Sequence, residues 1–157
     1  MCDYSLMSLP NRLAVEGEEL VTHRFPGWTI GLASPANLQS ARDLRPARRR
    51  SFWSALSEMF EPSKSPCVAA VCIPPGTRLL VRDIPEELQT ELRVGQTEHA
   101  TFTQITADPY SYRDAIRFRN GREVILQNLR EGQRVRVLDM GIAEKRDPLM
   151  ELLSRAG

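Results

Sequence analysis

Residues 115–126, AIRFRNGREVIL, decide the fold that this sequence predicts. Apolar and charged residues alternate on both sides of Asn120-Gly121, a dipeptide that favours the two-residue type I′ turn of a β-hairpin. In that register Ile116 lies opposite Ile125, and directly opposed residues share one face of the sheet. The predicted core face carries Ile116, Phe118 and Ile125, and the predicted basic face carries Arg117, Arg119 and Arg122.

Strand signals continue on both sides of this hairpin, as alternating or apolar segments separated by glycine and proline turns. Helix signals are brief: Pro85 begins one segment, and Asp147 precedes another near the end of the chain. The sequence therefore predicts a mostly β fold of about eight strands. We expect a small antiparallel barrel or rolled sheet with a short C-terminal helix and one or two minor helices. The other predicted strands are residues 4–9, 18–25, 28–34, 67–73, 77–83, 95–105 and 129–140.

The 157 residues suit a single domain, residues 1–157. Residues 34–66 differ in character, because an arginine-rich run without periodicity is followed by SFWSALSEMF. Ser51 can cap a short amphipathic helix over residues 51–60. We interpret residues 34–66 as an arginine-rich excursion between strands.

Charge is balanced overall, since 21 Lys and Arg residues meet 20 Asp and Glu residues for a net charge of +1. No global field therefore attracts the protein to nucleic acid or to a membrane. All of the basic residues except Lys64 and Lys145 are arginine. A GC-rich genome explains such a bias, but arginine also offers a planar fork of donors for phosphate or carboxylate.

The three cysteines, Cys2, Cys67 and Cys72, bear on where the protein resides. An odd number is atypical of a secreted disulfide framework. No signal peptide is visible, and no apolar run approaches the ~20 residues that span a bilayer. We therefore expect a cytoplasmic protein with reduced thiols and no transmembrane segment. The spacing of the cysteines and histidines matches no zinc motif, so neither a metal nor a cofactor is expected.

Cys2 directly follows the initiator methionine, and removal of Met1 would place a free α-amine beside its thiol. An N-terminal amine can act as the general base for its own side chain. One hypothesis is therefore a cysteine-dependent enzyme, with Cys2 as nucleophile and Asn11, Arg12 or Arg113 stabilising an oxyanion. The alternative is that Cys2 is a small residue in a first strand.

Tyr112, Arg113 and Asp114 stand at the entry to the predicted hairpin. Neighbouring Arg and Asp residues usually form a structural ion pair. In a pocket, Arg113 would instead bind an anion beside Tyr112, and Asp114 would act as a base or orient a catalytic group. The predicted ligand-binding residues are thus Tyr112, Arg113, Arg117, Arg119 and Arg122.

A second basic region, residues 42–53, combines arginines with aromatic side chains. Such a segment can bind single-stranded nucleic acid by charge and stacking, or place a helix on an anionic membrane, although most such runs are solvated loops. The predicted partner-binding residues here are Arg48, Arg49, Arg50, Phe52 and Trp53. Arg134 and Arg136 would extend the basic face of the hairpin.

Three segments resemble an uncharacterised family of small bacterial proteins: MCDYSL, CVAAVCIPPGT and the stretch from YRDAIRF to RVRVL. Members begin Met-Cys-Asp-Tyr-Ser-Leu and contain a similar Arg-Asp-Ala strand and Gly-Gln turn. The resemblance covers most of the chain apart from the excursion, and it implies no known activity. The site residues that it implies are Cys2, Asp3, Asn11, Arg12, Arg113 and Asp114.

Three functions remain open from the sequence. The first is a cytoplasmic binding or accessory module that contacts a protein partner or a small anionic ligand through arginines. The second is the cysteine-dependent enzyme. The third is nucleic-acid binding through residues 42–53 and the basic face of the hairpin.

Overall fold

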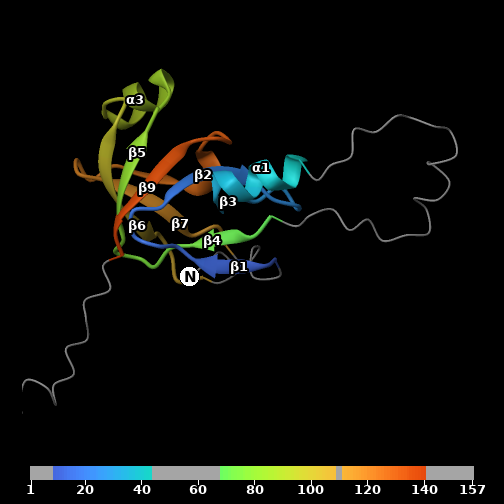
Figure 1. Ribbon diagram of the computed structural model, residues 1–157. Coiled ribbons are helices and arrows are strands. Elements are labelled where there is room, and N and C mark those ends of the chain that lie inside the picture. The colour runs from blue at the N-terminus through green and yellow to red at the C-terminus, as the bar shows by residue number, and fades with distance from the viewer. Residues whose placement is uncertain (1–8, 44–67, 109–110, 141–157) are drawn as a thin grey trace, which may run out of the picture.

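The computed structural model describes residues 9–43, 68–108 and 111–140 (Figure 1). The predictions for Cys2, for a helix over residues 51–60 and for a C-terminal helix lie outside these ranges. Along the chain the elements are β1 (Asn11–Leu13), β2 (Glu19–Arg24), β3 (Ile30–Ala33), α1 (Pro35–Asp43), β4 (Ala70–Cys72), β5 (Arg78–Arg82), α3 (Glu86–Leu92), β6 (Glu98–Gln104), β7 (Asp114–Phe118), β8 (Glu123–Ile125), η2 (Leu126–Asn128) and β9 (Arg134–Asp139).

Seven strands form one antiparallel sheet in the order β3-β2-β9-β5-β6-β7-β8. Beside it, β1 and β4 form a parallel pair in which Asn11 lies opposite Ala70. The prediction of a mostly β fold is confirmed. Because β9 lies between β2 and β5, the last described strand joins the N-terminal hairpin to the rest of the sheet.

The described strands do not close into a barrel through a continuous ladder, because β3 and β8 are the edges of the sheet. The two edges nevertheless come together at Gln127, in the turn η2 that follows β8. The Gln127 side-chain oxygen accepts the N–H of Ile30 at 3.2 Å, and its amide nitrogen donates to the Ile30 carbonyl at 3.4 Å. One amide side chain therefore takes the place of a neighbouring strand at the start of β3.

The core lies on one face of the sheet, and the opposite face is charged. In β9, Val135 and Val137 are fully buried, whereas Arg134 and Arg136 are exposed. The same alternation separates an inner apolar face from an outer polar face along most of the sheet. The largest fully buried side chains include Leu20, Ile73, Leu79, Val81, Phe102, Ile116, Val135 and Val137.

The register of the β7–β8 hairpin differs by one residue from the predicted one. Ile116 lies opposite Val124 instead of Ile125, and Arg117 lies opposite Glu123. Val124 therefore shares the core face with Ile116. Arg122, next to Glu123 in the chain, belongs to the face opposite that of Arg117, so the prediction that it lies on the basic face is wrong.

The side chain of Asn120 explains this shift. The hairpin loop, residues 119–121, has a positive φ only at Gly121 (82°), whereas a type I′ turn requires positive φ at both central residues. The Asn120 side chain accepts the N–H of Arg122 at 3.0 Å. Its amide nitrogen also donates to the carbonyls of residues 92 and 93, at 2.9 and 3.0 Å. Asn120 thus ties the loop to the end of α3 as well as shaping the turn.

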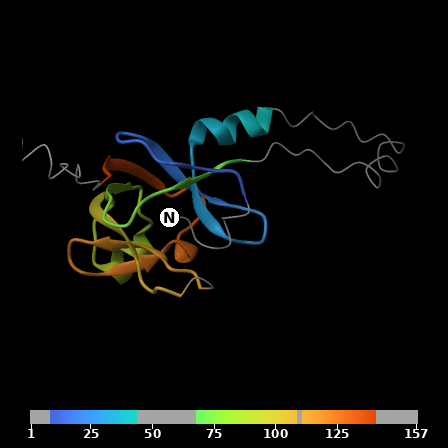
Figure 2. The same ribbon diagram turned by 90° about the horizontal axis from the view of Figure 1, so that it is seen from below.

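Of the two described helices, α3 follows Pro85 as predicted, but α1 lies inside the segment that showed no periodicity. The signal for α1 is Ser34-Pro35, because proline favours the first helical position and the N–H of Leu38 donates to the Ser34 carbonyl at 3.2 Å. None of the α1 residues is buried. Figure 2 shows α1 on the opposite side of the molecule from the orange β7–β8 hairpin.

Candidate anion-binding site

A row of directly opposed residues crosses the outer face of the sheet. Arg78 on β5 lies opposite Thr101 on β6, which in turn lies opposite Arg117 on β7. Carboxylates end the row, because Asp139 on β9 lies opposite Arg78 and Glu123 on β8 lies opposite Arg117. Each arginine therefore lies between a carboxylate on one neighbouring strand and Thr101 on β6.

The two end pairs orient the guanidinium groups. Arg78 Nη2 lies 3.2 Å from an oxygen of Asp139, and Arg117 Nε lies 2.5 Å from an oxygen of Glu123. The arginine side chains are 68% and 57% exposed, and ion pairs this exposed add little to stability. Since an arginine carries five N–H donors in a fixed fork, each retains donors for a ligand. Both guanidinium groups therefore point toward a carboxylate and still have donors with which to bind an anion.

A hollow of about 210 Å³ lies over this row. Its lining includes His99, two residues before Thr101 on the same face of β6, and Arg119, two residues after Arg117. Neighbouring strands are about 4.8 Å apart, so β5 and β7 are separated by about 10 Å. Two arginine side chains can bridge that separation and meet over Thr101. The polar lining residues are Arg78, His99, Thr101, Arg117 and Arg119.

An irregularity in the β5–β9 pairing supplies one of the apolar residues that line the hollow. Arg78 lies opposite Asp139 and Leu79 opposite Val137, so Leu138 is an extra residue between the two pairs. Leu138 lines the hollow beside Arg78. The bulge thereby adds Leu138 to the apolar part of the lining, which also includes Ala100 and Phe118.

Positive charge in the hollow is concentrated at Arg119. Arg78 and Arg117 are each compensated by a carboxylate, whereas Arg119 forms no ion pair with another residue in the described part of the chain. His99 adds a ring that carries a further charge when protonated. The hollow therefore has an excess of one positive charge when His99 is neutral and is suited to an anion.

The structure brings together two of the five predicted ligand-binding residues, Arg117 and Arg119. Tyr112 is 45% exposed and precedes β7. Arg113 precedes β7 too, and its backbone carbonyl accepts the N–H of Ile105 at 2.9 Å. Asp114, expected to act as a base, is buried and accepts a hydrogen bond from Gln104 Nε2 at 3.0 Å.

Sequence reasoning missed Arg78, His99, Thr101 and Leu138 as site residues. The alternation of residues 95–105 already placed His99 and Thr101 on one face. Nothing local indicated that β5 would pair with β6, or that β9 would carry a bulge. The partner-binding residues Arg48, Arg49, Arg50, Phe52 and Trp53 lie outside the described residues.

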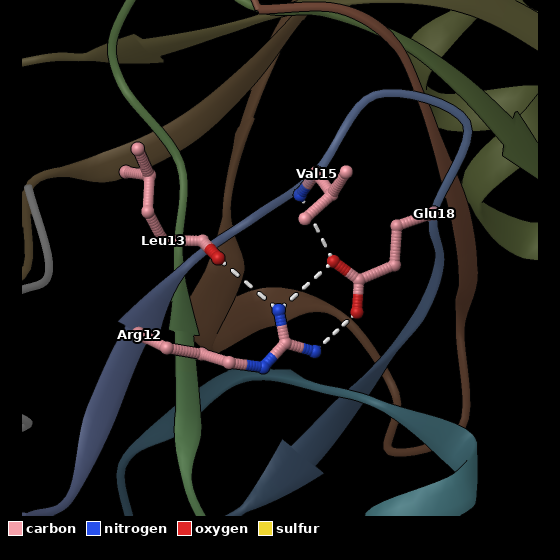
Figure 3. A network of polar contacts seen from close by, with 4 residues as sticks. All are labelled: Arg12, Leu13, Val15 and Glu18. Carbon is pink, nitrogen blue, oxygen red and sulfur yellow. Dashed lines mark hydrogen bonds and ion pairs between the residues drawn. The ribbon is translucent and has the colours of Figure 1, made fainter.

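Arg12, the expected oxyanion-stabilising group, forms a local network instead (Figure 3). Its guanidinium donates to both carboxylate oxygens of Glu18 and to the Leu13 carbonyl, and Glu18 also accepts the N–H of Val15 at 3.0 Å. The hydrogen bond from Arg12 is the main reason that the pKa of Glu18 lies below its usual value, and the same bond raises the pKa of Arg12. The Asn11 side chain likewise donates to the nearby Leu9 carbonyl at 3.0 Å.

The cysteine chemistry differs from the expectation in one respect. Cys72, at the end of β4, is disulfide-bonded, whereas reduced thiols were expected. Cys2 and Cys67 lie outside the described residues.

No group of three or more His, Cys, Asp or Glu side chains in residues 9–43, 68–108 and 111–140 is arranged to hold a metal ion. Neither described helix is long and apolar enough to cross a membrane.

Comparisons with known proteins give no relatives. No family model matches the chain, and no curated protein or solved structure matches it. The resemblance to the small bacterial family therefore stays an expectation, and the candidate site rests on its geometry alone.

Proposed function

We propose that the protein is a binding module for a small anionic ligand, held on the outer face of the sheet by Arg78, Arg117 and Arg119. The observation that carries this proposal is the convergence of three arginines and His99 on one hollow of about 210 Å³. Guanidinium groups bind phosphate and carboxylate oxygens through charge-assisted hydrogen bonds. A rolled sheet, supported by the contact between Gln127 and Ile30, would keep this charged face on the outside.

A small ligand fits the hollow better than a nucleic acid strand does. Proteins that bind single strands combine basic grooves with aromatic side chains on which bases stack. The aromatic residue among the described lining residues, Phe118, is only 4% exposed and faces the core. Nucleic-acid binding would therefore depend on residues 42–53, which lie mostly outside the described chain.

The cysteine-dependent enzyme remains an alternative that rests on Cys2. Two of the groups expected to assist it are engaged elsewhere, Arg12 with Glu18 and Asp114 with Gln104. No observation on the described residues favours this alternative over the binding module.

Titration with inorganic phosphate and pyrophosphate at low ionic strength tests the proposal. The chain has two histidines, and only His99 lines the hollow. We expect both anions to shift the imidazole proton resonances of His99, and the affinity to fall as salt rises. Arg119→Gln should weaken binding about tenfold or more, since it removes a charge-assisted contact. Arg122→Gln, the same change on the other face of the hairpin, should have no effect. If neither anion shifts His99, or if the two variants behave alike, the proposal is wrong.

A further inference from the structure

A second cavity, remote from the arginine row, lies between α1 and β2. It has a volume of about 320 Å³, within the range of sites for small molecules. Its floor is β2 with the turn that precedes β9, and its other wall is α1. Although no α1 residue is fully buried, Leu38 packs against the cluster of Phe25, Ala33 and Ala70, and the same face of the helix lines the cavity.

The sheet side of the cavity is an acceptor wall, in which Glu131 supplies the acceptor and His23 lies beside it. His23 Nδ1 lies 2.8 Å from Glu131 Oε1, which also accepts the N–H of Arg24 at 3.2 Å. That backbone hydrogen bond is the main reason that the pKa of Glu131 is lowered, so Glu131 is a carboxylate that only accepts. Nδ1 of His23 is therefore the donor in this contact, which places the imidazole ring beside the Glu131 carboxylate.

This acceptor wall is held firmly in place. The ring of His23 contacts the ring of Phe25 edge-on, with centroids 5.0 Å apart. The turn that carries Glu131 is fixed to β2, because Gly132 N–H donates to the Thr22 carbonyl at 2.8 Å and Thr22 N–H donates to the Gln133 carbonyl at 3.0 Å. The carboxylate and the imidazole are thus positioned before any ligand arrives.

The helix side of the cavity is a donor wall. The α1 residues that line the cavity, Pro35, Leu38, Gln39 and Arg42, follow the i, i+3, i+4, i+7 spacing of one helical face. Arg42 and Gln39 supply a guanidinium and an amide, while Leu38 and Pro35 are apolar. Arg42 makes no ion pair with Glu131 or with any other described residue. Arg42 and Glu131 therefore line the same cavity of about 320 Å³ without forming an ion pair.

We infer that this cavity binds a free α-amino acid with an apolar side chain. The ammonium group of the ligand would donate to the Glu131 carboxylate beside His23, and the carboxylate of the ligand would accept from Arg42 and Gln39. Val21 and Leu38 offer an apolar surface for its side chain. A zwitterion offers an ammonium group to Glu131 and a carboxylate to Arg42 at the same time. A simple anion would be repelled by Glu131, and a simple cation would be repelled by Arg42.

Imidazole NMR tests the inference, because one of the two histidines lies at each candidate site. The His23→Gln and His99→Gln variants assign the resonances. L-Leucine is expected to shift His23 and leave His99 unchanged. Leucinamide, which lacks the carboxylate, and N-acetyl-leucine, which lacks the ammonium, should each bind about tenfold more weakly or worse.

Two arginine variants complete the test. Arg42→Gln should weaken L-leucine binding about tenfold, while Arg130→Gln is the matched control, since Arg130 is exposed and pairs with Glu87 at 3.1 Å. Both variants should bind phosphate at His99 like the parent, so the two sites can fail independently. The inference is overturned if L-leucine leaves His23 unshifted, if the two blocked ligands bind as well as L-leucine, or if Arg42→Gln and Arg130→Gln have equal effects.

Discussion

Arg78 and Arg117 lie opposite the same residue, Thr101, from the two sides of β6. The strands that carry these arginines, β5 and β7, do not pair with each other, because β6 lies between them and sets their separation. Each guanidinium is turned by its own carboxylate, Asp139 or Glu123. Two arginines with the Thr101 hydroxyl between them can donate to one ligand from both sides of β6.

If one anion bridges the two arginines, their contributions to binding are coupled. We expect Arg78→Gln and Arg117→Gln each to weaken pyrophosphate binding about tenfold. The double variant should lose less than the product of the two single losses, because the second substitution removes a contact that the first has already weakened. Calorimetric titration of the four proteins measures this coupling.

A matched control for this cycle lies on the same face of the sheet. Arg134 on β9 pairs with Asp83 at 3.5 Å and does not line the hollow. Arg134→Gln should leave pyrophosphate affinity unchanged. Losses that multiply fully in the double variant would show that Arg78 and Arg117 do not share one ligand.

The Asn120 side chain should stabilise both the hairpin and its connection to α3. Asn120→Asp keeps the acceptor for the Arg122 N–H but removes both donors to the carbonyls of residues 92 and 93. It also places a carboxylate beside those carbonyls. We expect the free energy of unfolding in urea to fall by about 2 kcal/mol. Arg119→Ala, the neighbouring exposed position, should change it by less than about 0.5 kcal/mol, and equal stability of the two variants would contradict the role given to Asn120.

Stability should depend on pH through Glu18. Its pKa in the folded protein is lowered, first by the hydrogen bond from Arg12, so the carboxylate contributes stability above its unfolded-state pKa of about 4.3. That contribution is lost as pH falls through the lower folded-state pKa. Glu18→Gln should therefore cost about 1 kcal/mol at pH 7, and the difference from the parent should shrink as the pH falls below about 4.

Thermal or urea unfolding of the parent and Glu18→Gln between neutral and acid pH measures this difference. Glu87→Gln is the control, because Glu87 is 72% exposed in its pair with Arg130 and should contribute less than about 0.5 kcal/mol at any pH. A constant gap between the parent and Glu18→Gln across the pH range would exclude the proposed linkage.

The contact between Gln127 and Ile30 should be visible in amide exchange. Gln127→Leu removes both hydrogen bonds to the backbone of Ile30. The Ile30 amide should then exchange with solvent about tenfold faster, and the free energy of unfolding should fall by about 1–2 kcal/mol. Asn128→Ala, at the exposed neighbouring position, should leave Ile30 protected. An unchanged exchange rate in Gln127→Leu would mean that another group protects that amide.

The Cys72 disulfide can be checked by peptide mapping without reductant. A fragment containing Cys72 should be recovered linked to a second cysteine-containing fragment and should separate from it after reduction. A link to Cys2 would remove the nucleophile on which the cysteine-dependent enzyme rests. Alkylation of Cys72 without prior reduction would contradict the disulfide.

Much of the fold can be predicted from the alternation of apolar and polar residues, because successive side chains of a strand point to opposite faces of the sheet. The β2–β3 hairpin, β6 and β9 were predicted in this way. The hairpin register was not, since the Asn120 side chain both accepts the Arg122 N–H and reaches the carbonyls of residues 92 and 93. A contact between parts of the chain so far apart leaves no trace in the pattern around the turn.

The candidate site could also be predicted only in part from the sequence. Arg117 and Arg119 were identified because the predicted hairpin itself placed them on one face. Arg78 joins them only through the order of β5, β6 and β7, and Leu138 only through the bulge in β9. Both are long-range pairings, which the spacing of residues in one segment cannot reveal.

The bond between Gln127 and Ile30 also bears on how the protein behaves at high concentration. An open sheet exposes unpaired N–H and carbonyl groups along its outermost strand, and a second copy of the chain can add to them strand by strand. Here the first residue of β3 already has both groups satisfied by a side chain. Because the Ile30 N–H is already paired, an incoming strand finds no free donor at that position, which disfavours strand addition at the start of β3.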